Sequence, residues 1–300
     1  MATPRKLLQA TSLALCALAA AAAASEDPAY RAPDSSEIDV SLERSRALDL
    51  TARISAVSER FVGAPYAPSP LGEGDAGGPD ADPRLRFDTF DCTTFVETAM
   101  ALSLVEASVQ VEPLLDAIRY RDTVPSFVNR RHFPAAEWIP DLVELGFLED
   151  ITREVAGDAV VVEATILNSE IWDRRSTKIL SELPDDRIPD GKFRLDLWPL
   201  AAARTGYRRI PSGTVVSTMR ADRPRLPVRI THQGLVIVED GKHLIRHAAN
   251  EPFERVVDEP LADYLDRIRG FREWHVVGIH LARVREPDDL RRFTGSHRDN

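Results

Sequence analysis

The residue in this chain best suited to covalent chemistry is Cys92, in the stretch DCTTFVET. A thiolate is a strong nucleophile, but a free cysteine with a pKa of about 8.5 is mostly protonated at neutral pH. The start of a helix offers backbone N–H groups and a favourable dipole to an anion, and Asp91 is a good N-cap residue. The sequence therefore predicts that Cys92 begins a helix and acts as a nucleophile. The alternative is a small buried structural cysteine.

A cysteine nucleophile needs a base, and histidine is the usual one. Among the seven histidines, His232 and His247 flank Asp240-Gly241, a dipeptide that favours a type I′ hairpin turn. In the register set by that turn, Gly234 pairs with His247 and His232 with Ala249. Side chains alternate faces along a strand, so the two histidines are predicted to be diagonal neighbours that touch. Gly234 is expected to leave the space above the pair open.

The remaining histidines lack such a constraint. His243 shares the face but lies near the turn, and we expect an ordinary surface or turn residue there. His132, in NRRHF, is predicted to be a hydrogen-bonded or exposed loop residue. Cys92, His232 and His247 are nominally three zinc ligands, but the sequence adds neither a second nearby cysteine nor a local histidine cluster. No metal or other cofactor is predicted.

The elements that must position these residues follow an α+β pattern. Apolar residues at helical spacing predict one helix over about 50–61 and a second from Cys92 to about Glu106. EPLLDAIRYR and PAAEWIPDLVELGFL predict shorter helices. Four strand-like runs come later: SGTVVSTM, THQGLVIVED, KHLIRHAAN and WHVVGIHLARV. Helices first and an antiparallel sheet second indicate an α+β fold.

The N-terminal residues 1–24 have the pattern of a secretory signal peptide, with Arg5 and Lys6 ahead of an alanine-rich apolar run. This run is shorter than the roughly 20 residues that span a bilayer, so no stable membrane span is predicted. We expect the mature protein to be exported to the periplasm or the extracellular space. The other predicted segments are a flexible leader at 25–39, a single catalytic domain at 40–286 with a poorly assigned insertion at about 153–210, and a C-terminal tail at 287–300.

Removal of the signal peptide changes both the cysteine count and the charge. Of the 2 cysteines, Cys16 would be lost, so Cys92 would remain without an intramolecular disulfide partner. The alternative is lipid attachment at Cys16, although Leu15 is bulkier than the residue that normally precedes a lipid-modified cysteine. The removed segment contains Arg5 and Lys6 and no acidic residue, so its loss shifts the net charge from -10 to -12. An acidic protein of this kind argues against nucleic acid as a partner.

The separated motifs resemble NlpC-type cell-wall amidases and peptidases, which have a papain-like fold. FVGAPYAPSPLGEG precedes FDCTTFVETAMAL, and IPSGTVVS, THQGLVIV and LIRHAAN follow in the same order as in that superfamily. A closer resemblance is to a bacterial family long known as a domain of unknown function and associated with N-acetylmuramoyl-L-alanine amidase activity. It rests on DCTTFVET, IRYRD, RRHFPAAEWIPDLVELGFLEDIT, RHAA, VVDEPLADYL and VGIHLARV, and covers residues from about 45 to 285.

This resemblance implies that Cys92 is the nucleophile, His232 the general base and acid, and His247 the orienting third member. It also implies that Tyr66, in GAPYAP, lies beside the nucleophile and helps to hold an oxyanion. The substrate would be peptidoglycan fragments, or muropeptides, cleaved between the lactyl group of muramic acid and L-alanine. The alternatives are a D-glutamyl–diamino-acid endopeptidase, a transglutaminase-like Cys-His enzyme and a non-catalytic module that binds peptidoglycan fragments.

Stem peptides of peptidoglycan carry carboxylates, and RYRDTVPSFVNRRHF concentrates arginines in an otherwise acidic chain. Arginine forks bind carboxylates well, so Arg119, Arg121 and Arg131 are predicted substrate-binding residues. Their alternative is solvated charge on a helix or loop. Glu97, shortly after the cysteine, is predicted to receive a substrate amine, with a structural ion pair as the alternative.

Overall fold

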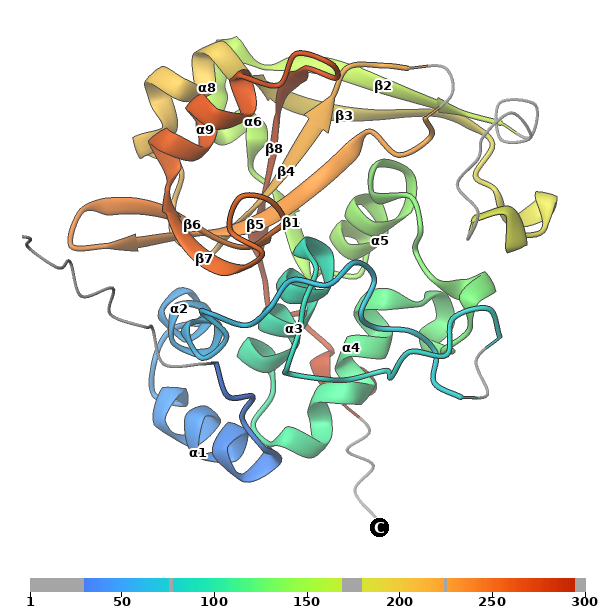
Figure 1. Cartoon of the computed structure of the whole chain (residues 1–300), viewed down its shortest axis with the longest axis vertical. Helices are drawn as coiled ribbons and strands as arrows, with labels where there is room; N and C mark the ends of the chain where they lie inside the picture. Colours follow the sequence, from blue (N-terminus) through green and yellow to red (C-terminus); the bar gives the residue numbers. More distant parts are fainter. Residues whose placement is uncertain (1–29, 76–77, 169–179, 224–225, 295–300) are drawn as a thin grey trace, which may run out of the picture.

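The computed structural model describes residues 30–75, 78–168, 180–223 and 226–294 (Figure 1). Its centre is an antiparallel sheet with the strand order β2-β3-β8-β4-β5-β6-β7, and β1 pairs with β8. The described strands are β1 (Leu148–Asp150), β2 (Val161–Leu167), β3 (Gly191–Pro199), β4 (Thr214–Arg220), β5 (Ile230–Glu239), β6 (Lys242–Ala249), β7 (Arg255–Pro260) and β8 (Val276–Val284). The predicted α+β class with an antiparallel sheet is confirmed.

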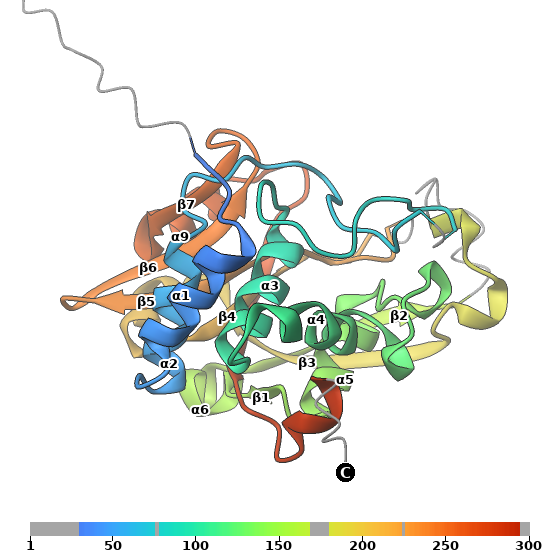
Figure 2. The same ribbon diagram turned by 90° about the horizontal axis from the view of Figure 1, so that it is seen from below.

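Helices cover both faces of the sheet. The first face carries α1 (Ser35–Ser45), α2 (Leu50–Glu59), α3 (Cys92–Leu104), α4 (Val111–Arg119) and α5 (Ile139–Glu144), and the second carries α6 (Thr152–Ala156), α8 (Leu200–Gly206) and α9 (Leu261–Arg269). Figure 2 looks onto α1 to α4 in front of the strands. Along β5, Leu235 and Ile237 join the core beneath α3, whereas Val236 joins the core beneath α9. The sheet is therefore the middle of three layers.

The helix α3 is the central helix of the first face. It begins at Cys92, as predicted, because the Asp91 carboxylate accepts a hydrogen bond from the Thr94 N–H at 2.8 Å. It ends at Leu104, since Val105 has an extended backbone (φ -109, ψ 163). Every residue from Thr94 onward in α3 is buried. The helix is thus enclosed on all sides instead of presenting one apolar stripe.

The hairpin of β5 and β6 has the predicted register. Asp240 and Gly241 have φ angles of 49 and 74, the pair of positive values that a type I′ turn requires. Glu239 pairs with Lys242, and Val238 pairs with His243. The two-residue turn therefore fixes which side chains of the two strands face each other.

Both ends of the predicted domain need correction. The helix α1 begins at Ser35, inside the predicted flexible leader, because Asp34 forms a capping box at its start. Within the predicted tail, Leu290–Phe293 forms a 3₁₀ turn, and Phe293 packs against Phe147 with ring centroids 5.0 Å apart. The predicted signal peptide lies outside the described residues. None of the described helices has the length and apolar character needed to cross a membrane.

The segment at about 153–210, poorly assigned from its sequence, extends the sheet. It contributes α6, β2, β3 and α8, and β3 joins the main sheet where Trp198 pairs with Ile279 of β8. The edge strand β2 leaves Val161, Val162 and Ile166 exposed. Adjacent apolar residues on both faces of an edge strand hide the alternation that would identify it. Residues 169–179 of this segment are outside the described part.

Candidate active site

A pocket of about 230 Å³ opens where the start of α3 meets the start of β5. Cys92 and His232 both line it. Thr93 and Gln233, which follow these two residues in the sequence, join α3 to β5. The Thr93 hydroxyl donates a hydrogen bond to Gln233 Oε1 at 3.0 Å. The structure therefore brings the predicted nucleophile and the predicted base to one pocket.

The two predicted histidines are in direct contact. His232 Nε2 lies 2.6 Å from His247 Nδ1, and the ring planes are 86° apart. The ring of Tyr264, on α9, packs against both, with centroid distances of 6.0 Å to His232 and 5.5 Å to His247. The diagonal contact predicted from the hairpin register is present, and an aromatic side chain holds the pair in place.

Gly234 is required by close packing around His247. A Cβ atom at this position would lie 2.8 Å from Ile245 Cγ1 and 2.9 Å from His247 Cβ. The space that Gly234 was expected to leave open is therefore occupied by Ile245 and by the Cβ atom of His247. The glycine sets how closely His247 approaches β5.

The charge state of Cys92 differs from the expectation of a helix-stabilised thiolate. Burial and the neighbouring Asp91 carboxylate raise the pKa of the thiol to about 12. Hydrogen bonds from the Gln233 backbone and the Thr93 side chain oppose this rise but are smaller. In the described part of the chain, Cys92 Sγ has a side-chain contact with Thr93 Oγ1 at 3.9 Å and no hydrogen bond to His232. The resting thiol is therefore protonated at neutral pH.

His232, the predicted base, is also uncharged in the resting protein. Burial, with smaller effects from His247 and two nearby arginines, lowers the pKa of His232 well below 6.5. Burial likewise lowers the pKa of His247, although the carboxylate of Glu259 opposes this. A neutral imidazole can accept a proton, so the pocket contains an uncharged thiol and an imidazole able to act as a base.

Two residues beside the histidine pair were not identified from the sequence. Glu259, on β7, places Oε2 3.2 Å from His247 Nε2, and Arg267, on α9, donates hydrogen bonds of 2.9 Å and 2.6 Å to the two Glu259 oxygens. Tyr264 is the second missed residue. The available signal was the VVDEPLADYL motif, which contains Glu259 and Tyr264. Their contacts depend on how β7 and α9 pack, which spacing alone does not reveal.

Tyr66, the predicted oxyanion residue, lies near enough to Cys92 to be affected by its charge, although it is not among the residues that line the pocket. It forms a β-bridge with Phe90, two residues before Cys92, and its N–H donates to the Glu254 carbonyl at 2.9 Å. Burial, with the charges of Cys92 and Asp91, raises the pKa of the Tyr66 hydroxyl to about 12. The hydroxyl is therefore a protonated donor at neutral pH.

Two of the predicted substrate-binding arginines use their side-chain N–H groups in bonds to other parts of the protein. Arg131 donates from Nη1 to three backbone carbonyls between residues 117 and 120, and from Nε to Asp141 at 2.9 Å. Arg121 pairs with the buried Glu137 and does not line the pocket. These contacts hold α4 and the following loop together. Arg131 also lines the pocket, but its Nε and Nη1 are used in these structural bonds.

The third arginine forms a buried ion pair in the pocket wall. Arg119 Nε lies 3.3 Å from Glu97 Oε2, and the two side chains are 4% and 5% exposed. Glu97 Oε1 also accepts a hydrogen bond of 2.8 Å from Trp138 Nε1. Burial raises the pKa of Glu97 to about 7, although Arg119 opposes this. Glu97 therefore has the geometry of a structural ion pair, the alternative considered above. Arg119 Nη1 has no hydrogen-bond partner among the described residues.

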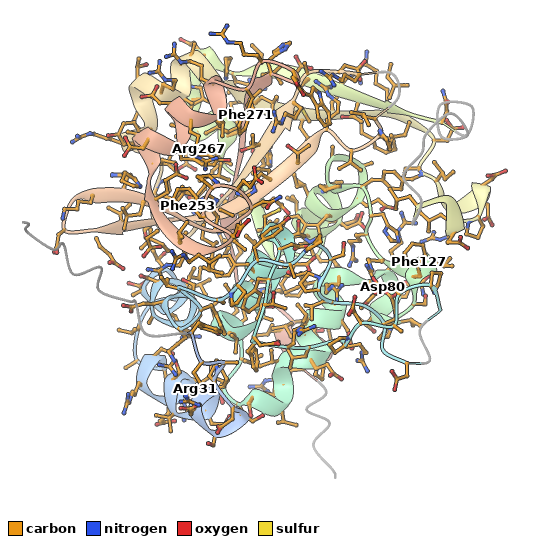
Figure 3. All side chains as sticks on the ribbon, viewed as in Figure 1. Arg31, Asp80, Phe127, Phe253, Arg267 and Phe271 are labelled. Carbon is orange, nitrogen blue, oxygen red and sulfur yellow. The ribbon has the colours of Figure 1, made fainter. Side chains whose placement is uncertain are left out.

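Arg130 and His132, which also line the pocket, are held by other residues. Arg130 donates a hydrogen bond of 2.8 Å to Asp80, and its guanidinium lies over the ring of Phe127; Figure 3 shows Asp80 and Phe127 on the same side of the molecule. His132 Nε2 lies 2.7 Å from the Phe127 carbonyl oxygen, and burial lowers the pKa of His132 to about 4. His132 is the hydrogen-bonded loop residue that the sequence predicted. Its neighbours fix the shape of the pocket.

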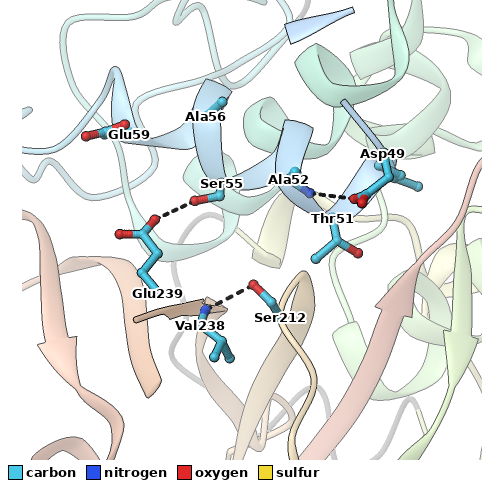
Figure 4. Close-up of a pocket in the computed structure, with 10 residues that line it drawn as sticks. Asp49, Thr51, Ala52, Ser55, Ala56, Glu59, Ser212, Val238 and Glu239 are labelled. Atoms are coloured by element: carbon cyan, nitrogen blue, oxygen red, sulfur yellow. Dashed lines mark hydrogen bonds between the residues drawn. The ribbon is translucent and has the colours of Figure 1, made fainter. Parts of the chain in front are cut away.

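A larger hollow of about 690 Å³ lies between α2 and the end of β5 (Figure 4). Its polar groups bond to one another: Ser55 Oγ donates to Glu239 Oε1 at 2.7 Å, and the Val238 N–H donates to Ser212 Oγ at 3.0 Å. It contains no cysteine or histidine, so the smaller pocket at Cys92 is the candidate active site. Across the residues that the structure describes, no three His, Cys, Asp or Glu side chains gather as metal ligands.

A family model matches most of the chain. It is that of the AmiA-like family, described as N-acetylmuramoyl-L-alanine amidase-like, and it matches residues 56–271. This match includes the pocket, both histidines, Glu259 and Arg267. The comparison with curated proteins found no match.

Solved structures share the fold. A Legionella pneumophila protein has a TM-score of 0.76 and 25% identity, over 85% of this chain and 96% of that chain. An N-acetylmuramoyl-L-alanine amidase from Bacteroides uniformis has a TM-score of 0.62 and 23% identity, over 79% of this chain and 99% of that chain. A Bacteroides fragilis protein provisionally named a xylanase has a TM-score of 0.57 and 21% identity, over 76% and 99%. At such identities the last two bear on the fold and not on the reaction.

Proposed function

The chain belongs to the AmiA-like, N-acetylmuramoyl-L-alanine amidase-like family, and we propose that it hydrolyses the amide between N-acetylmuramic acid and L-alanine in muropeptides. One observation carries the proposal: Cys92 and His232 line the same pocket, and His232 is bonded to His247 at 2.6 Å. We further propose that the protein is an NlpC-type thiol hydrolase of the papain-like class. Cys92, His232 and His247 would be its nucleophile, base and orienting residue.

The acylation step in this proposal starts from neutral groups. Cys92 Sγ attacks the carbonyl carbon of the amide while its proton passes to His232, so that no free thiolate accumulates beforehand. The tetrahedral intermediate carries the negative charge on the former carbonyl oxygen. His232 then gives the proton to the departing nitrogen, the C–N bond breaks, and a thioester with Cys92 remains.

Hydrolysis of the thioester completes the cycle. Water attacks the thioester carbon as His232 accepts one of its protons, and the C–S bond then breaks. The proton returns to Cys92 Sγ, and the products are the muramoyl carboxylic acid and a peptide with a free L-alanine amine. No oxidant, metal or external nucleophile other than water is needed.

The oxyanion in both tetrahedral intermediates needs hydrogen-bond donors. The first N–H groups of a helix have no partner within the helix, and Cys92 is the first residue of α3. We propose that the Cys92 N–H and the Tyr66 hydroxyl supply these donors. The raised pKa of Tyr66 supports this role, because it keeps the hydroxyl protonated.

Substrate recognition in this proposal falls to the pocket wall. Arg119 lines the pocket, and its buried Nη1 has no hydrogen-bond partner among the described residues. We propose that a small shift of its side chain lets it bind a carboxylate of the stem peptide. Arg121 and Arg131 are proposed to support the wall, and Glu97 to hold Arg119.

The test is to incubate the purified protein with muropeptides and identify the cleaved bond by mass spectrometry. Cleavage before L-alanine, abolished in Cys92→Ala, is the expected result. Cleavage after D-glutamate would replace the proposal with the endopeptidase. Muropeptide binding by both proteins, without products, would indicate the non-catalytic module. Products formed at an equal rate by Cys92→Ala would remove Cys92 from the mechanism.

Export is part of the same proposal. The signal-peptide pattern at residues 1–24 suits a protein whose substrate lies outside the cytoplasm. N-terminal sequencing of protein recovered from the periplasm or the medium should begin near Ser25. Recovery of full-length protein from the cytoplasm alone would contradict export without affecting the proposed chemistry.

A further inference from the structure

A chain of polar contacts runs from His232 into the interior of the protein. His232 Nε2 contacts His247 Nδ1 at 2.6 Å, and His247 Nε2 contacts Glu259 Oε2 at 3.2 Å. The second contact is close but is not directed like a well-formed hydrogen bond, and His247 Nε2 has no other partner among the described residues. His247 is fully buried and Glu259 is 6% exposed. Glu259 is therefore the acceptor that His247 Nε2 faces.

The charge on Glu259 follows from its neighbours. Burial alone would raise its pKa, but the hydrogen bonds from Arg267 and the contact with His247 outweigh burial and lower the pKa of Glu259 to about 2. An ionised carboxylate is only an acceptor. The hydrogen that lies between Glu259 and His247 must then be on His247 Nε2.

This placement determines the remaining protons. Burial lowers the pKa of His247, so its ring is neutral and carries one N–H. With that hydrogen on Nε2, His247 Nδ1 presents a lone pair to His232. The hydrogen bond of 2.6 Å then requires His232 Nε2 to be the donor. In a neutral His232, the Nδ1 lone pair is left as the basic site.

We propose that Glu259 is a positioning residue that selects the tautomers of His247 and His232, so that the free lone pair of His232 is on Nδ1. This inference rests on the proposed function, in which His232 accepts the Cys92 proton. Without the acceptor at Glu259, the opposite arrangement becomes favourable. His247 would then carry its hydrogen on Nδ1 and donate it to His232 Nε2, which would leave His232 Nδ1 protonated and unable to act as the base.

Other charged groups around the pair do not supply a competing acceptor. Arg267, on α9, holds both Glu259 oxygens and lies over the ring of Phe253, and Figure 3 shows these two labelled side chains next to each other. Asp258, on β7, is engaged by Arg246 at 2.7 Å. On β4, Arg220 adds only positive charge near His232. Tyr264, on α9, directs its hydroxyl to Thr218 Oγ1 at 2.5 Å.

The variant that removes the acceptor is Glu259→Leu, and Asp258→Leu is its matched control. Asp258, the neighbouring residue on β7, pairs with Arg246 through two hydrogen bonds, as Glu259 pairs with Arg267. Both variants break an ion pair of β7, so both lose stability, but only Glu259→Leu removes the carboxylate from His247. We expect kcat/KM to fall by about 10² to 10⁴ in Glu259→Leu and by no more than about 10-fold in Asp258→Leu. Glu259→Gln keeps an acceptor oxygen without the charge, and its kcat/KM should fall between them. Equal losses in Glu259→Leu and Asp258→Leu would mean that the ion pair of Glu259 is merely structural and would overturn the inference.

Nitrogen-15 NMR of labelled histidines reads the tautomers without any turnover. In the wild-type protein and in Asp258→Leu, His232 and His247 should both carry hydrogen on Nε2, whereas in Glu259→Leu both should carry it on Nδ1. Unchanged tautomers in a folded Glu259→Leu would contradict the inference. If the wild-type protein releases no product from muropeptides, the proposed function fails, and the NMR comparison still decides the role of Glu259.

Discussion

Cys92 and His232 line one pocket, and both side chains are uncharged at neutral pH. Burial and Asp91 hold the thiol in its protonated form, and burial keeps His232 uncharged. A resting thiolate–imidazolium pair is therefore not the state that these surroundings favour. In the proposed mechanism the proton moves from Cys92 to His232 during attack on the substrate. This agrees with the raised pKa of Cys92 and the lowered pKa of His232, because neither group has to be charged beforehand.

This charge state predicts how Cys92 reacts with iodoacetamide. Alkylation requires the thiolate, so its rate should keep rising above the midpoint of about 8.5 that free cysteine shows. Because the pKa of His232 is lowered, kcat/KM on muropeptides should also persist below pH 6.5, where an ordinary histidine becomes protonated. An alkylation profile with a midpoint below pH 7 would indicate an ion pair and contradict the neutral mechanism.

Asp91→Asn is the matched control for the alkylation experiment. Asparagine keeps an acceptor oxygen for the helix N-cap, and it removes the negative charge that raises the pKa of Cys92. Its alkylation profile should move to lower pH while the protein stays folded. A profile identical to that of the wild type would leave burial as the whole cause of the raised pKa.

At the scale of secondary structure, the β5–β6 hairpin sets the distance between the histidines. The turn at Asp240 and Gly241 fixes the register, and Gly234 lets Ile245 and His247 pack against β5. A methyl group at Gly234 would push these side chains away from the strand. Local strand spacing therefore controls a contact on which the chemistry depends.

Gly234→Ala is expected to cost about 1 to 3 kcal/mol of unfolding free energy because it overpacks a filled site. It should also lower kcat/KM, since His247 moves relative to His232. Gly241→Ala is the control: its φ of 74 strains the backbone by about 1 kcal/mol, but nothing lies within 4 Å of the added methyl group. Denaturant unfolding and kinetics on both variants measure the difference. If Gly234→Ala retains full activity, the histidine contact does not depend on this spacing.

The hairpin and the helix start could be predicted from the sequence because their signals are local. Asp240-Gly241 specifies a turn, and Asp91 caps α3. Glu259 could not be assigned in the same way, because its contact with His247 depends on the pairing of β6 with β7. The raised pKa of Cys92 could not be predicted from the sequence either, because burial is a property of the packed protein and not of the DCTTFVET stretch.

At the scale of the whole molecule, the described residues form two large hydrophobic cores on the two faces of the sheet and a smaller cluster that includes Phe127. The first core lies under α1 to α5, the second under α6, α8 and α9, and both include residues of β4, β5 and β8. The predicted boundaries at residues 40 and 286 missed α1 and the final 3₁₀ turn. The polar composition of these end segments concealed the few apolar side chains that attach them to the first core.

Phe293→Ala tests whether the final turn is part of the folded domain. Phe293 is buried against Phe147, and its truncation should cost about 3 kcal/mol of unfolding free energy. The control is Val109→Ala, because Val109 is 78% exposed and its truncation should change stability by no more than about 0.5 kcal/mol. Thermal or denaturant unfolding measures both. If Phe293→Ala loses as little unfolding free energy as the control, residues 287–300 are a tail outside the folded domain, as the sequence predicted.

The burial of α3 has a consequence for how the protein loses activity. Segments that open by local fluctuation have exposed backbone and few buried contacts. From Thr94 to Leu104, α3 has no exposed residue, and it is packed between α2, α4 and the sheet. Opening this helix requires the surrounding layers to separate, so its amide hydrogens should exchange only through global unfolding. Cys92 is thus attached to a helix that opens only with the whole domain, and we expect heat inactivation and loss of the fold to be a single event.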